Sequence, residues 1–416
     1  EDIIGLNNGG LKKEERECRE CYKSGEVSDE GKCEICQALI ELSPRIIRED
    51  SVFVVKDKFE KILPRATLAL PFNRSITLKS IDDARKDNYV RVYSKNQPSM
   101  GQSFATNLWI GDYSVKSNKG LGSKDFEEFA KESKGIDRVA VLRADVDDLG
   151  KAFISGFKDQ KDGIVVKNSM RKYETISRTS TLSRHLSMFF KFYINKILKD
   201  YNRNALIVYS GGDDMFIAGS WDDIIDLAKD IRDAFIRYTQ GTLTLSAGIG
   251  IYNHSYPISR MATEVGDLEN AAKVKDEDKN KVTLFREGRV DEYNKTIDED
   301  WVLSWGQLPS FTPQEDEAGT NISITNSGIQ EKLDMLNKTF KRDKQNGKAF
   351  LYKMLEFIRE CQSDKINIAR YAYLLRRAEE RNKNLDVTTF YKWIQDSNGR
   401  KELEVAITLY SYLTRK

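Results

Sequence analysis

Residues 205–219 read ALIVYSGGDDMFIAG, in which two short apolar runs flank a polar centre that extends from Ser210 to Asp214. Each run has the length and composition of a β-strand, and a Gly pair between two such runs is typical of a tight hairpin turn. The stretch therefore predicts a β-hairpin that carries Asp213 and Asp214 at its tip. Taken alone it also fits an ordinary solvated turn, because glycine supplies the unusual backbone angles and aspartate is common beside it.

A second acidic motif lies about 65 residues upstream. Residues 139–151 read VAVLRADVDDLGK, an apolar run that ends in Asp145, Asp147 and Asp148. Carboxylates therefore crowd the ends of two separate predicted strands. Carboxylate oxygens are ligands of Mg²⁺, and two such ions roughly 4 Å apart can activate a ribose 3′-hydroxyl and stabilise a leaving pyrophosphate. The two motifs together indicate nucleotidyl transfer.

Strand and helix patterns alternate around these motifs. After the first strand come an amphipathic helix, the hairpin, a second helix that Gly241 ends, a strand, a third helix and a last strand. The order β-α-β-β-α-β is ferredoxin-like and sets the first strand beside the hairpin, which brings Asp145 near Asp213 and Asp214. The predicted helices span about 182–197, 224–238 and 258–273, and the later strands span 243–251 and 282–285.

Four cysteines near the N-terminus have the spacing of a zinc site. Cys18 and Cys21 form one C-x-x-C pair, Cys33 and Cys36 form the other, and 11 residues separate the pairs. This spacing predicts a closed tetrahedral Zn²⁺ site that braces the fold and leaves no open position for catalysis. The alternatives are a site that has lost its metal and a pair of disulfides, which a cytoplasmic setting disfavours.

The 416-residue chain is long enough for two to four domains. Lys and Arg total 67 and Asp and Glu total 65, so the formal net charge is only +2. This balance excludes a protein that coats nucleic acid by bulk charge, and any RNA contact must be local. No apolar run reaches the roughly 18 residues of a membrane span. We therefore expect a soluble, cytoplasmic protein with no membrane partner.

The acidic first-strand motif, the Gly-Gly-Asp-Asp hairpin and the four upstream cysteines resemble the large subunit of the type III-A CRISPR-Cas (Csm) effector complex. The strand-helix-hairpin order is similar to the palm domain of nucleotidyl cyclases, GGDEF diguanylate cyclases and palm-type polymerases. The resemblance implies a metal-dependent nucleotidyltransferase that converts ATP into cyclic oligoadenylates when target RNA binds. It implies as partners the small and backbone repeat subunits of the Csm complex, the CRISPR guide RNA and the target RNA.

The resemblance also implies roles for individual residues. Three of the five aspartates in the two motifs, Asp145, Asp213 and Asp214, would be catalytic. The ligands of Mg²⁺ or Mn²⁺ would be these three and Val146. Gly150 and Lys151 follow the acidic strand end, where backbone N–H groups and an ammonium suit phosphate oxygens. The further candidates for ATP binding are Ser183, Gly211, Gly212, Lys273 and Lys279.

The chain is expected to be α+β and multidomain. A tetracysteine zinc-binding segment spans 1–43, a β-rich accessory region with a linker spans 44–134, the palm spans 135–295 and a C-terminal helical bundle spans 296–416. Glu1 stands where a first Met would, and the family carries a phosphohydrolase-type domain and another palm before this region. We therefore expect the C-terminal part of a longer protein, which alone binds one nucleotide and fails to join two.

Two other interpretations compete with an oligoadenylate synthase. One is a non-catalytic scaffold palm that organises the guide-RNA-bearing complex, although the mutual repulsion of unpaired carboxylates would destabilise such a fold. The other is a diguanylate cyclase, although the hairpin reads Asp-Asp-Met where that family has Asp-Glu-Phe or Glu-Glu-Phe. A His-Asp nuclease pair is absent, since neither His185 nor His254 is followed by Asp.

Overall fold

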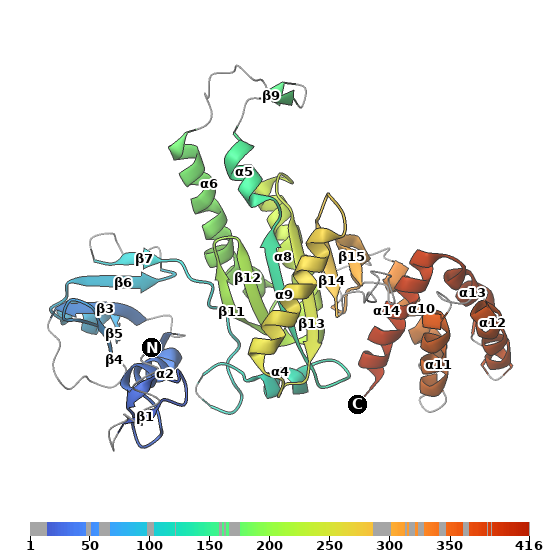
Figure 1. The fold of residues 1–416 in the computed structure, drawn as a ribbon, viewed down its shortest axis with the longest axis horizontal. Helices are drawn as coiled ribbons and strands as arrows, with labels where there is room; N and C mark the ends of the chain where they lie inside the picture. Colours follow the sequence, from blue (N-terminus) through green and yellow to red (C-terminus); the bar gives the residue numbers. More distant parts are fainter. Residues whose placement is uncertain are drawn as a thin grey trace, which may run out of the picture. The chain divides into compact units, whose positions relative to one another are not determined.

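The chain forms two compact units, one of residues 1–110 with 116–123 and one of residues 111–115 with 124–416 (Figure 1). The first unit contains the four cysteines of the two C-x-x-C pairs, and the second contains both acidic motifs. The computed structural model describes residues 15–46, 51–57, 67–97, 104–120, 122–157, 160–161, 164–165, 175–285, 301–312, 314–315, 321–322, 328–340, 347–360, 366–380, 382–383 and 385–415.

The first unit combines a short hairpin with a small sheet. Its elements are β1 (Glu15–Glu17), β2 (Ser24–Glu26), α2 (Glu34–Ile46), β3 (Ser51–Asp57), β4 (Thr67–Leu70), β5 (Arg74–Ser80), α3 (Ile81–Lys86), β6 (Arg91–Lys95) and β7 (Thr106–Leu108). Strands β1 and β2 pair with each other, and the other five form a sheet of order β4-β5-β3-β6-β7. Val52, Val54 and Val92 are buried with Ala84 of α3, so β-branched residues on the pleated surface build this core.

A six-stranded sheet forms the centre of the second unit (Figure 1). Its strands are β8 (Val139–Val146), β11 (Ala205–Gly211), β12 (Asp214–Ser220), β13 (Leu245–Tyr252), β14 (Lys281–Leu284) and β15 (Val302–Ser304). The order is β11-β12-β8-β13-β14-β15, and β8 pairs antiparallel with both β12 and β13. The hairpin of β11 and β12 therefore lies beside the first strand, as predicted.

Strand β15 corrects the expectation that the chain is helical from residue 296 onward. Val302 and Leu303 are buried and pair with β14, so they extend the sheet by one more strand. A 3-10 turn, η3 (Trp305–Gln307), follows, and its Trp305 donates the indole N–H to the carbonyl of Leu245 at 3.0 Å. This connection is thus part of the sheet's core and precedes the helices.

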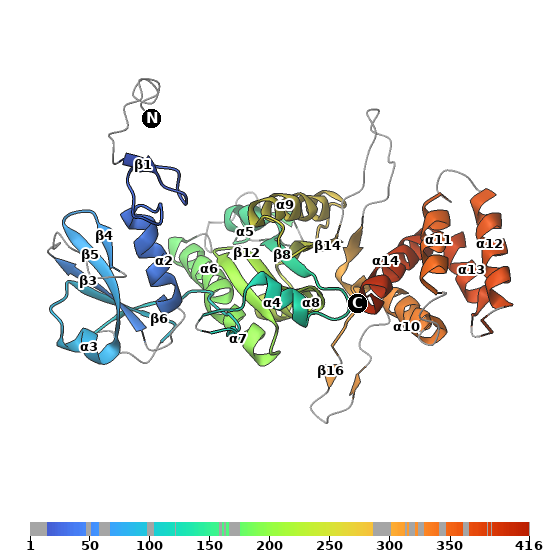
Figure 2. The same cartoon turned by 90° about the horizontal axis from the view of Figure 1, so that it is seen from below.

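Helices cover both faces of the six-stranded sheet (Figure 2). They are α4 (Phe126–Glu132), α5 (Leu149–Ser155), α6 (Ile176–Met188), the π-helix η2 (Phe189–Tyr193), α7 (Ile194–Asp200), α8 (Trp221–Thr239) and α9 (Ile258–Val274). Ala140 and Leu142 of β8 belong to the core that includes α8, whereas Val139 and Val141 pack against residues of α4 and α9. Because side chains alternate along a strand, Asp145 shares the face that α9 covers.

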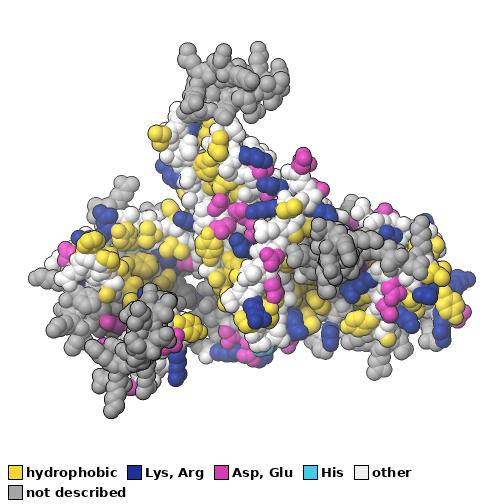
Figure 3. Space-filling view, viewed as in Figure 1, with side chains coloured by type: hydrophobic (Ala, Val, Ile, Leu, Met, Phe, Trp, Pro, Cys, Tyr) yellow, Lys and Arg dark blue, Asp and Glu magenta, His cyan; other side chains and the backbone are white. Residues whose placement is uncertain are grey.

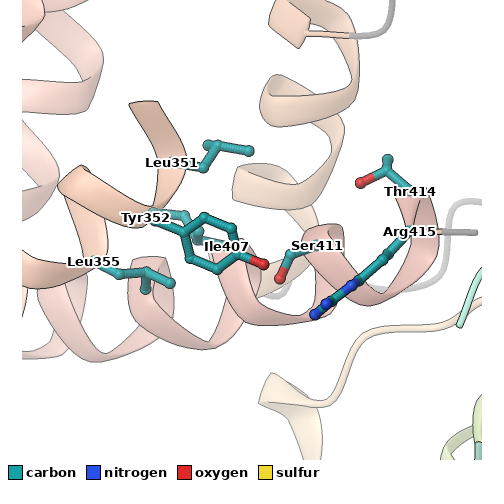
Figure 4. Close-up of a pocket in the computed structure, with 7 residues that line it drawn as sticks. All are labelled: Leu351, Tyr352, Leu355, Ile407, Ser411, Thr414 and Arg415. Atoms are coloured by element: carbon teal, nitrogen blue, oxygen red, sulfur yellow. The ribbon is translucent and has the colours of Figure 1, made fainter. Parts of the chain in front are cut away.

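The C-terminal part of the second unit is helical, which confirms the predicted helical end. Its described helices are α10 (Gly328–Phe340), α11 (Gly347–Glu360), α12 (Ile366–Glu379), α13 (Val387–Gln395) and α14 (Ser397–Thr414). Leu336 of α10, Leu375 of α12 and Leu403 of α14 are fully buried. A cavity of about 170 Å³ between α11 and α14 is lined by Leu351, Tyr352, Leu355, Ile407, Ser411, Thr414 and Arg415 (Figure 4).

Short two-residue strands complete the described elements of the second unit. They form two antiparallel pairs, β9 (Gln160–Lys161) with β10 (Ile164–Val165) and β16 (Gln314–Glu315) with β17 (Asn321–Ile322). None of the helices in the described part of the chain combines the length and apolar character needed to span a bilayer.

Candidate active site

The hairpin tip and the first strand meet at the acidic residues. Gly212 and Asp213 form the turn between β11 and β12, and Gly212 has φ = 63°, the left-handed conformation that tight hairpin turns need. Asp214 is the first residue of β12 and lies directly opposite Asp145 of β8. Directly opposed residues of an antiparallel pair place their Cβ atoms roughly 5 Å apart on the same face. Sequence segments about 65 residues apart therefore converge at this point.

Asp213 is linked to the same strand through its main chain. The N–H of Val146 donates to the carbonyl of Asp213 at 3.2 Å, which fixes the turn to the end of β8. The pKa of the Asp213 side chain is raised, first by burial and then by the negative charges of Asp145 and Asp214. Asp213 therefore lies close enough to the other two carboxylates to be affected by their charge.

A lysine on α9 neutralises part of this charge. The Lys273 ammonium hydrogen-bonds Oδ2 of Asp145, and it lies 2.7 Å from Oε1 of Glu269. The other oxygen of Glu269 lies 2.9 Å from Nε of Arg143. Burial opposes the charge on Lys273, but the hydrogen bonds to Asp145 and Glu269 outweigh it and raise the pKa of the ammonium. The α9 face thus carries an ionic chain of Asp145, Lys273, Glu269 and Arg143.

Two hydroxyl groups flank the aspartates. Tyr209 of β11 donates its phenolic O–H to Asp214, and that carboxylate is the main cause of the rise in the pKa of Tyr209 to about 12. Ser246 of β13 lies opposite Asp145 on the other side of β8. Its side chain is fully buried, and its hydroxyl has no hydrogen-bond partner among the described residues.

The residues at this point fit a divalent cation in their chemistry. Three carboxylates share one end of the sheet, and acidic and basic side chains lie next to one another there in the space-filling view (Figure 3). Mg²⁺ and Mn²⁺ prefer such oxygen ligands, and the raised pKa of Asp213 reports negative charge that a cation would relieve. In this structure one oxygen of Asp145 is paired with Lys273 and one oxygen of Asp214 accepts a hydrogen bond from Tyr209.

The other two aspartates of the first motif have different partners. Asp147 is buried, and its Oδ2 accepts hydrogen bonds from the hydroxyl of Thr244 at 2.8 Å and the main-chain N–H of Asn280 at 3.1 Å. Asp148 has φ = 51° and binds both Lys279 at 2.8 Å and Lys151 at 3.0 Å. These lysines lower the pKa of Asp148, Lys279 more than Lys151. Asp148 thus holds Lys151.

The remaining nucleotide-binding candidates are Gly150, Gly211 and Ser183, for which the structure gives a position but no contact with a ligand. Gly150 in the first turn of α5 is exposed, and a Cβ there would meet nothing within 4 Å. Gly211 ends β11, next to the turn that holds Gly212. Ser183 is exposed on α6, and no contact among the described residues joins it to the aspartates. The proposed roles of these residues stay predictions.

The four cysteines form the second candidate metal centre. Their sulfur atoms all lie within 4.8 Å of one another, and in the described part of the chain no other set of three or more His, Cys, Asp or Glu side chains is as close. The sulfurs of Cys21 and Cys33 are 3.7 Å apart, the spacing that Zn–S bonds of about 2.3 Å impose in a tetrahedron. N–H groups of Cys21 and then Cys33 lower the pKa of Cys18 to about 6. The set fits Zn²⁺.

Sequence reasoning missed the residues that hold Lys273 and Asp214 in place. Glu269 stands four residues before Lys273 in the predicted third helix, a spacing at which opposite charges meet, so this pair was open to prediction. Arg143 lies inside the acidic motif itself, and Tyr209 immediately precedes the Ser-Gly-Gly turn. Their contacts depend on how α9 and β11 pack, which no local pattern states.

The comparisons with known proteins agree with this architecture. Residues 138–283 match the family model of the second palm domain of Cas10/Cmr2, and residues 337–416 match that of the second helical domain of the Cmr2 subunit of the CRISPR RNA silencing complex. The crystal structure of Csm1 in T. onnurineus aligns with a TM-score of 0.61 at 22% identity, covering 88% of this chain and 48% of that one. A Csm1–Csm4 cassette in complex with one ATP has the same TM-score and identity, covering 92% and 50%.

The fold and site therefore define a chain with a Cas10-type palm domain. The CRISPR system single-strand-specific deoxyribonuclease Cas10/Csm1 (subtype III-A) of Enterococcus italicus is 37% identical over 422 residues, which cover 99% of this chain and 48% of the relative. The Mycobacterium tuberculosis protein of the same name is 37% identical over 431 residues, covering 97% and 47%. The chain is a homologue of these type III-A large subunits over nearly its whole length, and it spans about half the length of these relatives.

Proposed function

We propose that this chain is the nucleotidyltransferase portion of a Cas10/Csm1 large subunit, which converts ATP into cyclic oligoadenylates when the assembled complex binds target RNA. The observation that carries the proposal is the direct opposition of Asp145 and Asp214 across β8 and β12, with Asp213 in the adjoining turn. In the proposed arrangement, the ferredoxin-like part of the palm comprises β8, the hairpin, β13 and the helices between them.

Each residue of the site has a proposed task. Asp145, Asp213 and Asp214, with the main chain of Val146, would hold Mg²⁺ or Mn²⁺, which supplies the charge that activates a ribose hydroxyl and neutralises the leaving pyrophosphate. Gly150 and Lys151 begin α5, where they would face phosphate oxygens. Lys273 and Lys279 would add positive charge, and Ser183, Gly211 and Gly212 would border the nucleotide.

The remaining cofactor and the partners follow the same reasoning. The cysteine cluster would bind a structural Zn²⁺, because a closed set of four sulfurs has no position left for a substrate. Similar structures crystallised as Csm1–Csm4 cassettes support Csm4 as a neighbouring subunit. The cassettes in complex with ATP and with cA4 support ATP as the substrate and a cyclic oligoadenylate as the product. The guide and target RNA and the other Csm subunits are proposed as partners through the assembled complex.

A scaffold without catalysis is the second candidate function. It is favoured by the pairing of Asp145 with Lys273, because this ion pair satisfies the carboxylate without a metal. The deoxyribonuclease activity in the relatives' names is not proposed for this part, since neither histidine of the chain is followed by Asp.

The test uses the assembled complex with its full-length large subunit. Labelled ATP and, separately, labelled GTP are incubated with the complex, with and without target RNA. We expect RNA-dependent oligoadenylates from ATP, and we expect Asp213→Ala with Asp214→Ala to reduce the product at least 100-fold, the scale on which lost charge stabilisation acts. Asp267→Ala is the matched control, because Asp267 is an exposed aspartate of α9.

The outcome separates the two candidates. Unchanged product from the double variant would refute the catalytic assignment of the hairpin. If the wild-type complex binds target RNA but forms no oligoadenylate from either nucleotide, only the scaffold function remains. Circular dichroism and gel filtration of each variant establish that the complex is intact before product is compared.

A further inference from the structure

Lys273 has two partners of different character. Asp145 is about a quarter exposed and lies at the open end of the sheet, whereas Glu269 is 4% exposed and belongs to the face of α9 that packs against β13. The ammonium contacts both at once. One partner is thus open to an incoming cation, and the other is enclosed by protein.

The enclosed partner is held rigidly. The helix α9 lies directly on β13, since a Cβ at Gly248 would come within 2.6 Å of the main-chain N of Glu269. On the helix's near side, a Cβ at Gly266 would come within 2.8 Å of a guanidinium nitrogen of Arg143. Nε of Arg143 lies 2.9 Å from the oxygen of Glu269 that Lys273 leaves free, an ion pair without hydrogen-bond geometry. Glu269 therefore has a fixed position and one oxygen reserved for the lysine.

This arrangement lets Lys273 release Asp145 without leaving the site. A buried carboxylate that loses its cation is costly, so Glu269 retains the ammonium. The carboxylate of Asp145 is partly exposed, so it can exchange the lysine ammonium for a divalent cation at much lower cost in free energy. Solvent and the incoming ion replace its lost contact with Lys273. The competition at Asp145 is then between a tethered ammonium and a metal ion.

We propose that Lys273 is a resident counter-ion that covers Asp145 while the site is free of metal, and that Glu269 is the positioning residue that retains Lys273 when a divalent cation takes Asp145. This inference rests on the proposed function, because it takes Asp145 as a metal ligand. Lys273 thereby sets the metal concentration at which the site fills. Its removal must tighten metal binding, whereas removal of a residue that merely supports the fold would weaken it.

The experiment measures Mn²⁺ binding to the nucleotide-free, full-length complex by electron paramagnetic resonance. Asp145→Asn with Asp214→Asn first identifies the signal of this site, which must disappear. We then expect Lys273→Met to tighten Mn²⁺ binding about tenfold, the equivalent of one pKa unit of charge interaction. Lys273→Arg keeps the charge and should bind Mn²⁺ within about threefold of wild type. Lys196→Met, which removes an exposed lysine of α7, is the matched control.

Glu269 is tested in a double-mutant cycle. Glu269→Gln leaves Lys273 with Asp145 as its remaining carboxylate partner, so Mn²⁺ binding should weaken several-fold. In the Lys273→Met background the same Glu269→Gln change should alter Mn²⁺ binding by less than about twofold. Thermal melting provides a second readout: in chelator Lys273→Met should melt lower than wild type, and Mn²⁺ should raise its melting temperature more than it raises that of wild type.

The two proposals fail in different ways. If the Mn²⁺ signal vanishes in the double aspartate variant but Lys273→Met binds Mn²⁺ no tighter than wild type, the counter-ion is overturned and the metal site stands. An equal effect of Glu269→Gln with and without Lys273 overturns the positioning role of Glu269. A signal that survives loss of both aspartates refutes the proposed metal site, and the counter-ion with it.

Discussion

The cysteine cluster and the acidic site both gather like-charged ligands, but they arrange them differently. The four sulfurs lie within 4.8 Å of one another, already at the spacing of a metal shell. At the acidic site, Asp145 pairs with Lys273 and Asp214 accepts a hydrogen bond from Tyr209. A closed shell suits a metal that holds a fold together, whereas ligands with exchangeable partners suit an ion that arrives with substrate.

The charge within each cluster shows the same contrast. The pKa of Cys36 is raised to about 12, chiefly by its hydrogen bond with Cys33 and then by burial, so without metal this thiol keeps its proton. The pKa of Asp213 is raised as well, by burial and by its two neighbouring aspartates. The cysteines have one another as partners, whereas Asp145 pairs with a lysine from another element. We infer that loss of metal disrupts the first cluster far more than the second.

Removing one sulfur ligand should therefore have the largest effect. Cys21→Ser is expected to eliminate bound Zn²⁺ and to expose the segment from β1 to α2 to proteolysis, because structural zinc contributes folding energy directly. Zinc content per chain and limited proteolysis of the full-length complex are the measurements. Glu26→Gln, an exposed change on β2, should keep the zinc. Full zinc occupancy in the serine variant would contradict the closed shell.

A change beneath α9 should have an intermediate effect. In Gly248→Ala the new Cβ meets the main chain of Glu269 and Val265 at 2.6 Å, so α9 must move away from β13. We expect a loss of about 1–3 kcal/mol in the free energy of unfolding, the range for overpacking, measured by urea denaturation. The shift of α9 also displaces Lys273, and Mn²⁺ binding should change with it.

Gly150→Ala is the matched control for that experiment. A Cβ at Gly150 has open space around it and the position lies in a helix, so stability should be unchanged or up to about 1 kcal/mol higher. Equal unfolding curves for the alanine variants at Gly248 and Gly150 would show that α9 does not press on β13.

Much of this arrangement could be read from the sequence because local patterns carry it. The apolar runs on either side of the Ser-Gly-Gly turn predicted β11 and β12, and the acidic run after Leu142 predicted carboxylates near the hairpin. The third helix, expected over 258–273, is α9 over Ile258–Val274, and Gly241 follows α8 with φ = 74°. Strand alternation, helical spacing and turn chemistry act over a few residues, so they appear in the sequence.

The remainder depends on packing that local patterns do not state. Asp145 lies inside β8 rather than beyond its end, since the pairing with β12 includes Asp145 and the pairing with β13 continues to Val146. The choice of Asp148 rather than Asp147 for Lys151 follows from the burial of Asp147 against Thr244 and Asn280. Likewise, β15 was missed because three residues give no periodic signal before a long helical region.

The smallest expected effect concerns the proton of Asp213. Because folding raises its pKa, the charged form costs stability at neutral pH, and this cost is relieved as the pH falls through the raised pKa toward the ordinary value of 3.8. In chelator, Asp213→Asn should therefore melt about 1–2 °C above wild type at pH about 7, a small difference because solvent screens this carboxylate. The difference should vanish near pH about 4. Added Mn²⁺ should reverse the order of the two melting temperatures at neutral pH, because only the wild type has the Asp213 carboxylate to bind the ion. Asp267→Asn serves as the control. If Asp213→Asn melts below wild type in chelator, the Asp213 carboxylate is not repelled by its neighbours. The acidic site would then be as stable without metal as an ordinary surface turn.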